Sequence, residues 1–323
     1  MSNNPKAPAK QAFLFFLPIT QLIILWLVSK FFPYDFSSII WVVGLLVLGM
    51  AHGAMDIVII KKNAANRNYF DAWKRVGWYL SLMVAAWIGL MLAPILTVLS
   101  FLIITAVHFG EADRTSFSDF FAKSPEFPKS WAWIRGSIVV AIPCYFYPRE
   151  SWEPFGSITA TPGGESLDLI LKTFSLSLLG LSCLFAAVSF FKCPEQIFSY
   201  GFLFFVLESI VAIFWFLSTP PLLAIGGYFL CMHATRHMQK LMSQFYSTTE
   251  NSIFSKQVKM HIDSLAFGLP AILFVIAWAL FLDSGSLIQK IAYSSIGFYL
   301  ISTLPHHILV SNMLEENRVQ NQV

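Results

Sequence analysis

The chain has 323 residues, of which 56% are hydrophobic and only 12% are charged, and its net charge is +3. An ordinary soluble domain carries about 25% charged residues, so this composition argues against a water-soluble fold. The small net charge gives no support for a nucleic-acid partner. The apolar residues occur in runs of about 20, the length that an α-helix needs to cross roughly 30 Å of hydrocarbon.

These runs predict an all-α fold, a polytopic transmembrane helical bundle of about ten spans, taken as one integral membrane domain over residues 1–323. A closed barrel would instead show shorter segments of alternating polarity. The Pro/Gly-rich stretch 153–165 is expected to form a non-cytoplasmic loop. The spans are expected over residues 12–29, 38–60, 76–93, 94–109, 131–147, 167–191, 197–217, 221–240, 262–282 and 288–311.

The distribution of basic residues predicts the orientation. With the N-terminus inside, most of the 21 lysines and arginines fall on the cytoplasmic side of the predicted spans. Short cytoplasmic loops are enriched in these residues. The chain is therefore expected to be a multi-pass protein of the cell (inner) membrane with both termini in the cytoplasm.

Histidines gather toward the cytoplasmic ends of four predicted spans, the second, fourth, eighth and tenth. Imidazoles that faced lipid would be costly, so these side chains are expected to face the bundle interior. Four helices that bring imidazole to one depth indicate a buried metal site. The seventh histidine, His261, is expected to be an interfacial residue. The six others are His52, His108, His233, His237, His306 and His307.

Two of these histidines are spaced so that they share one face of a helix. His233 and His237 are four residues apart, which puts both rings on one helical face and suits two ligands of one metal. An interhelical hydrogen-bonding pair would show the same spacing. Asp56 follows His52 by four and is expected to accept the distal N–H of a ligating imidazole. A helix-packing patch with a hydrogen-bonded aspartate is the alternative.

Further polar residues leave more than one role open. Glu111, three residues after His108, fits either a contact to a ligating histidine or a solvated loop carboxylate. Adjacent helical residues point about 100° apart, so at most one of His306 and His307 faces the same centre, as a ligand, a residue behind a ligand or a substrate contact. Glu208 lies deep in the seventh span and is either functional or protonated and hydrogen-bonded to another helix.

The ligand type does not select the metal. All-imidazole ligation without thiolate suits iron, zinc, copper or nickel. Zinc would support hydrolysis through an activated water, whereas iron would support dioxygen chemistry.

Four motifs together suggest a family: HGAMD at 52–56, HFGEAD at 108–113, HATRH at 233–237 and LPH at 304–306. Their order and topology resemble the Brp/Blh family of membrane β-carotene 15,15′-dioxygenases, although HGAMD has Met55 where a leucine or similar residue is expected. The resemblance implies a non-haem iron(II) enzyme in the lipid bilayer that cleaves the central double bond of β-carotene with O₂ to give two all-trans-retinal. It implies Fe(2+) ligation by His52, His108, His233 and His237, and a functional link to a retinal-binding rhodopsin.

Two other classes are weighed against this interpretation. A di-iron membrane desaturase or hydroxylase needs about eight or more histidines with HxxHH boxes, whereas this chain has seven and no such box. A haem-binding protein or metal transporter would also use paired histidines, but a transporter is expected to show internal repeats and polar groups at every depth. Neither is evident here.

Overall fold

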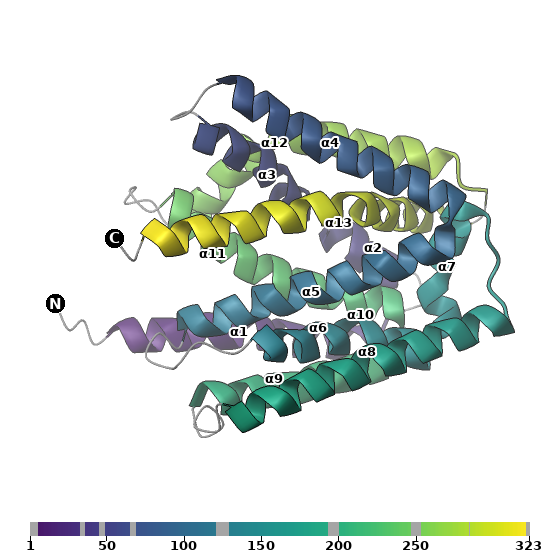
Figure 1. Ribbon diagram of the computed structural model, residues 1–323, viewed down its shortest axis with the longest axis horizontal. Coiled ribbons are helices and arrows are strands. Elements are labelled where there is room, and N and C mark those ends of the chain that lie inside the picture. The colour runs from purple at the N-terminus through teal and green to yellow at the C-terminus, as the bar shows by residue number, and fades with distance from the viewer. Residues whose placement is uncertain are drawn as a thin grey trace. The chain divides into compact units, whose positions relative to one another are not determined.

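The protein is described from a computed structural model, shown as a ribbon in Figure 1. The structure describes residues 6–32, 36–44, 49–64, 69–120, 129–192, 200–246, 253–283 and 285–320. Within these ranges every regular element is helical and no strand occurs, which confirms the predicted all-α class. The elements are α1 (Lys6–Ser29), α2 (Phe36–Gly44), α3 (Met50–Ala64), α4 (Tyr69–Leu92), α5 (Pro94–Phe120), α6 (Lys129–Phe146), α7 (Pro148–Thr159), α8 (Glu165–Lys192), α9 (Tyr200–Ser218), α10 (Pro221–Tyr228), the π-helical turn η3 (Phe229–Ala234), α11 (Thr235–Phe245), α12 (Ile253–Leu280) and α13 (Leu287–Gln320).

Four helical stretches are long and apolar enough to cross a membrane: 73–92, 94–114, 165–191 and 255–280. Two shorter apolar helical stretches, 16–29 and 202–218, accompany them in the described part of the chain. Large apolar side chains are exposed along α4 and α8, including Trp78, Trp87 and Leu181, as expected of helices that face lipid. The predicted count of ten spans stays a prediction.

One segment predicted to be a loop is helical. The non-cytoplasmic loop expected over 153–165 begins inside α7, which runs from Pro148 to Thr159. Pro148 suits the first position of a helix, where its missing N–H costs nothing. Trp152 and Phe155 of α7 are buried, so apolar packing stabilises a segment whose prolines and glycines resemble a loop.

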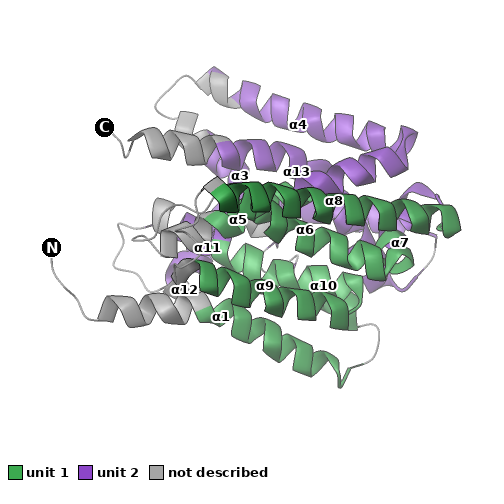
Figure 2. Cartoon of the chain, turned by 60° about the horizontal axis from the view of Figure 1, so that its bottom comes forward, with its two compact units in different colours: residues 1–41, 105–152, 163–236 green, residues 42–104, 153–162, 237–323 purple. Residues whose placement is uncertain are grey.

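The chain forms two compact units, each assembled from three separate stretches (Figure 2). Unit 1 contains residues 1–41, 105–152 and 163–236. Unit 2 contains residues 42–104, 153–162 and 237–323. The prediction of a single membrane domain is not tested by this division.

In unit 1, α5 and α6 approach each other through small residues. A side chain at Gly110 of α5 would overlap the carbonyl of Ala132 on α6, and one at Gly136 of α6 would overlap the carbonyl of Ala106 on α5. Each helix thus presents an Ala and a Gly four residues apart, the small-xxx-small pattern that lets membrane helices pack closely. His108 lies between the two small residues of α5, so this contact fixes its backbone.

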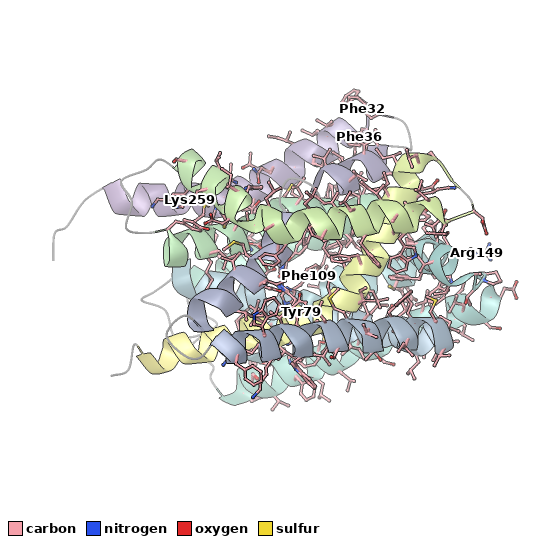
Figure 3. The ribbon with its side chains drawn as sticks, turned by 90° about the horizontal axis from the view of Figure 1, so that it is seen from above. Phe32, Phe36, Tyr79, Phe109, Arg149 and Lys259 are labelled. Carbon is pink, nitrogen blue, oxygen red and sulfur yellow. The ribbon has the colours of Figure 1, made fainter. Side chains whose placement is uncertain are left out.

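The rest of unit 1 packs around α6 and α10. Helix α6 packs on α8 and α9, and buried Ser137 and Ser182 join α6 to α8 with hydroxyl oxygens 2.6 Å apart. The apolar core combines α1, α5, α6, α9, α10 and η3. Phe109 belongs to this core and lies in the interior of the view in Figure 3, whereas the exposed Arg149 lies at its edge. The fully buried core residues include Leu22, Val139, Phe216, Leu223, Tyr228 and Met232.

In unit 2, α3 packs on α4, α12 and α13, and α13 also packs on α4 and α12. Ile60 of α3 contacts Val76 and Leu309, which brings the first turns after the HGAMD motif against α4 and α13. Tyr246, the residue that follows α11, donates a hydrogen bond to Asp263 Oδ2 of α12 at 2.6 Å. Burial and this hydrogen bond raise the pKa of the Tyr246 phenol above its ordinary value.

Candidate functional site

Unit 1 brings together two of the predicted metal ligands. His108 of α5 and His233 of η3 are both buried, and their ring centroids lie 4.9 Å apart at an interplanar angle of 63°. Phe109 lies 4.4 Å and Phe229 lies 5.8 Å from the His233 ring, measured between centroids. The imidazole pair therefore lies in a largely aromatic, water-poor environment.

His233 lies in a π-helical turn. The six residues Phe229–Ala234 form η3 between α10 and α11, and the Thr235 hydroxyl donates to the Leu230 carbonyl at 2.8 Å. Single π turns inserted in α-helices occur frequently at functional sites, because the extra residue changes which side chains face the interior. Here the turn includes His233 and Ala234, the first two residues of the HATRH motif.

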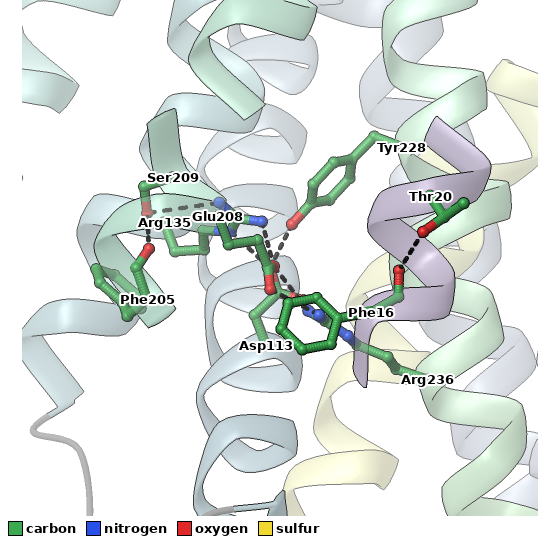
Figure 4. A network of polar contacts seen from close by, with 9 residues as sticks. All are labelled: Phe16, Thr20, Asp113, Arg135, Phe205, Glu208, Ser209, Tyr228 and Arg236. Carbon is green, nitrogen blue, oxygen red and sulfur yellow. Dashed lines mark hydrogen bonds and ion pairs between the residues drawn. The ribbon is translucent and has the colours of Figure 1, made fainter. Parts of the chain in front are cut away.

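A buried cluster of four charged residues adjoins this histidine pair in sequence and joins its helices (Figure 4). Arg135 of α6 donates from Nε to Asp113 Oδ2 at 2.9 Å and from Nη2 to Glu208 Oε1 at 2.6 Å. Arg236 of α11 donates from Nη1 and Nη2 to the Glu208 carboxylate at 2.9 and 2.7 Å, and its Nη1 lies 3.5 Å from Asp113 Oδ1. The Tyr228 hydroxyl donates to Asp113 Oδ2.

The two arginines and two carboxylates balance in charge, which is how buried ions are tolerated. Asp113 follows His108 by five residues, and Arg236 follows His233 by three. Asp113, Arg135, Glu208 and Arg236 together form the charge cluster. Because Glu208 and Arg135 link Asp113 to Arg236 by hydrogen bonds, the charge cluster fixes the two segments that carry the histidine pair.

Unit 2 holds a second arrangement around Asp56. Asp56 of α3 is buried, and its Oδ2 lies 2.7 Å from Nδ1 of His306 on α13. Tyr79 of α4 donates its hydroxyl to the same oxygen at 3.0 Å. The rings of His237 and His306 lie 6.0 Å apart between centroids, at an interplanar angle of 66°. Three helices thus meet at one carboxylate beside a pair of imidazoles.

Some predicted site residues lie elsewhere or outside the description. The backbone of His52 lies in α3, but its side chain is outside the described part of the structure. Glu111 pairs with Arg114, whose Nη2 lies 2.8 Å from Glu111 Oε2, so its carboxylate is directed to that guanidinium. Among the described residues, no group of three or more His, Cys, Asp or Glu side chains is placed to hold a metal ion.

Two sequence interpretations change with these contacts. Glu208 was expected to be functional or protonated and hydrogen-bonded to another helix, and it forms ion pairs with Arg135 of α6 and Arg236 of α11; its functional role stays a prediction. Arg135 and Arg236 were counted with the cytoplasmic charges, yet both are buried in the charge cluster. Opposite charges in separate apolar runs were the signal in the sequence, since such charges must pair in a low-dielectric interior.

The family model described as "Beta-carotene 15,15'-dioxygenase" matches residues 43–314. The chain belongs to this family. The resemblance drawn from the four motifs is thereby confirmed, and the region that the β-carotene 15,15′-dioxygenase family model matches contains all seven histidines and the whole charge cluster.

A relative within the family is described as a probable β-carotene 15,15′-dioxygenase Blh of Halobacterium salinarum. It is 25% identical over 210 residues, which make up 61% of this chain. The match spans 60% of the length of that relative. No solved structure matches the chain. The β-carotene 15,15′-dioxygenase family assignment therefore comes from sequence, and the contacts above give its motifs a structural context.

Three residues that take part in these buried contacts were not predicted from the sequence: Tyr79, Asp113 and Tyr228. Asp113 belongs to the HFGEAD motif, but Glu111 is nearer to His108 in helical spacing and was chosen instead. The two tyrosines lie in apolar runs where an aromatic residue is ordinary. Only the fold reveals that their hydroxyl groups meet buried carboxylates.

Proposed function

We propose that this protein is a membrane dioxygenase that cleaves the central double bond of β-carotene with O₂, giving two molecules of all-trans-retinal. The family match over 43–314 carries this proposal. Each oxygen atom of O₂ ends in one of the two aldehydes, so the reaction consumes no further reductant. The product would be available to a retinal-binding rhodopsin in the same membrane.

The proposed metal is iron(II), held by His52, His108, His233 and His237. A metal–nitrogen bond of about 2.0–2.1 Å puts an imidazole centroid roughly 3.2 Å from the ion, so two rings on one ion lie at most roughly 6.4 Å apart. The His108–His233 separation of 4.9 Å meets this condition. Four neutral nitrogen donors without thiolate are also chemically suited to iron.

Iron, when bound, would supply the dioxygen chemistry that amino-acid side chains lack. The protein itself positions the reacting groups and excludes water from them. Phe109 and Phe229 enclose His233 and provide apolar surface suited to a polyene. The charge cluster holds the segments that carry His108 and His233 at a fixed distance, which is how a scaffold positions reacting groups.

Expression in a β-carotene-accumulating bacterium tests the activity. The active protein should remove the orange colour and produce retinal on chromatography. His237→Ala should abolish both retinal formation and bound iron, whereas His261→Ala should preserve them, because His261 Nδ1 lies 2.8 Å from the Gln257 carbonyl of its own helix. Retained activity in His237→Ala would refute its assignment as a ligand.

Metal analysis of the purified protein separates the enzyme classes. About one iron per chain is expected for the proposed dioxygenase. Two irons per chain would favour a desaturase-type centre, and a Soret band in the absorption spectrum would favour haem. Absence of retinal from a well-expressed, folded protein would overturn the proposal.

A further inference from the structure

His306 has the environment of a metal-binding histidine. Its side chain is buried in unit 2, and Nδ1 lies 2.7 Å from Oδ2 of Asp56, a carboxylate that is only 1% exposed. Histidines that bind metals almost always donate their other ring N–H to a carboxylate, a carbonyl or water. This contact fixes the tautomer and directs Nε2 away from Asp56.

The carboxylate is itself held in place. Tyr79 donates to the same Oδ2 at 3.0 Å, so Asp56 receives hydrogen bonds from α4 and α13 while it belongs to α3. A carboxylate held by two donors on two other helices has little rotational freedom. His306 is therefore oriented by a chain of three side chains, Tyr79, Asp56 and His306.

His237 supplies a neighbouring imidazole in the same unit. The two ring centroids are 6.0 Å apart, within the limit of roughly 6.4 Å for two imidazoles on one ion. The carboxylate contact also distinguishes the doubled histidines after Pro305. Because adjacent helical side chains point about 100° apart, His307 does not share the direction that Asp56 gives to His306.

We propose that His306 is a metal ligand that binds through Nε2 beside His237, and that Asp56 and Tyr79 are positioning residues for it. The proposal rests on the proposed function for the presence of the metal. It gives Asp56 a positioning role toward an imidazole of α13. It also adds a ligand to the four histidines that the family motifs indicate.

The experiment uses the full chain in detergent micelles, loaded with iron(II) without oxygen. X-ray absorption spectroscopy counts the imidazoles on the ion, and a competition titration gives the iron affinity. His306→Ala should remove one imidazole from the count and weaken iron binding. Asp56→Asn should keep the count but weaken binding by about 10–100-fold, as expected for the outer partner of a ligating histidine. Tyr79→Phe should weaken binding less.

His261→Ala is the matched control, since it removes a half-buried imidazole of unit 2 whose Nδ1 contacts the Gln257 carbonyl. It should leave the imidazole count and the affinity unchanged. Far-UV circular dichroism and gel filtration check folding. If His306→Ala does not fold, His306→Gln is measured by the same two criteria.

An unchanged imidazole count in a folded His306 variant would overturn the inference. If His237→Ala lost iron in the same series, the proposed function would still stand, so the two failures are distinguishable. Wild-type protein that takes up no iron would overturn both. A lower affinity with an unchanged imidazole count would show that His306 only supports the site, and it too would overturn the assignment as a ligand.

Discussion

Arg236 directs both terminal nitrogens of its guanidinium at the carboxylate of Glu208, with Nη1 2.9 Å from Oε1 and Nη2 2.7 Å from Oε2. This bidentate ion pair requires the planar guanidinium of arginine, and it is stronger than a single charged hydrogen bond. It joins α9 to α11 three residues after His233. Glu208 also accepts from Arg135, so one carboxylate serves two buried cations.

Replacing Glu208 with Gln should therefore destabilise the protein strongly. The variant keeps the shape of the side chain but leaves two buried guanidinium groups with Asp113 as their only carboxylate in the charge cluster. Removing one partner of a buried ion pair typically costs about 3–5 kcal/mol. The free energy of unfolding in detergent micelles measures this loss.

Arg149→Ala is the control for the Glu208 variant. Arg149 forms an ion pair with Asp168 in the same unit, with Nε 3.0 Å from Oδ2, but its side chain is 71% exposed. Exposed pairs contribute little because water and salt screen them. Arg149→Ala should leave stability unchanged, and equal losses in the two variants would contradict the importance assigned to the charge cluster.

The close approach of α5 and α6 leads to a second prediction, on the stability of a glycine variant. Ala is ordinarily preferred to Gly inside a helix by roughly 0.5–1 kcal/mol. At Gly136 the added methyl group would overlap the backbone carbonyl of Ala106, and backbone cannot move aside as a side chain can. Gly136→Ala should therefore destabilise by about 1–3 kcal/mol, the range found for overpacking.

Gly180→Ala in α8 provides the comparison, because nothing lies within 4 Å of the added methyl group. It should be neutral or stabilising by up to about 1 kcal/mol. Thermal unfolding of both variants in the same detergent measures the difference. Equal behaviour would mean that α5 and α6 do not approach as closely as the structure places them.

The helices could be predicted because the length of the apolar runs alone indicates membrane helices. An apolar stretch of about 20 residues has few alternatives to a membrane helix, and Pro94 marks the break between α4 and α5 correctly. Helix α7 was missed because Pro154 and Gly156 are typical of loops. Its helicity comes from the burial of Trp152 and Phe155, which the local sequence does not reveal.

The candidate site was predictable only in part. His233 and His237 were found from their spacing, and Asp56 from its position after His52. The partner of Asp56 could not be found, because His306 is 250 residues away and only tertiary packing brings the two together. Glu208 stood out in its apolar run, whereas Arg135 was counted with the cytoplasmic charges, because no local pattern states which charges are buried and paired.

The π-helical turn could not be predicted from the sequence either, because one additional residue in a helix leaves the apolar pattern of the segment almost unchanged. Its hydrogen bonding gives the last prediction. The Leu230 carbonyl accepts from the Thr235 hydroxyl at 2.8 Å, while the Thr235 N–H donates to the Met232 carbonyl. The side chain of Thr235 thus gives the carbonyl of Leu230, inside the π-helical turn, a hydroxyl donor.

Thr235→Val removes the hydroxyl and preserves the branched shape, so it should destabilise the protein by about 0.5–1.5 kcal/mol, the net value of one hydrogen bond. Thr235→Ser retains the hydroxyl and should lose less. Because His233 lies two residues earlier, in the turn whose Leu230 carbonyl this hydroxyl contacts, Thr235→Val should also weaken iron(II) binding, measured by titration in micelles without oxygen. If the valine and serine variants matched each other in both measurements, the hydroxyl would have no part in holding the turn.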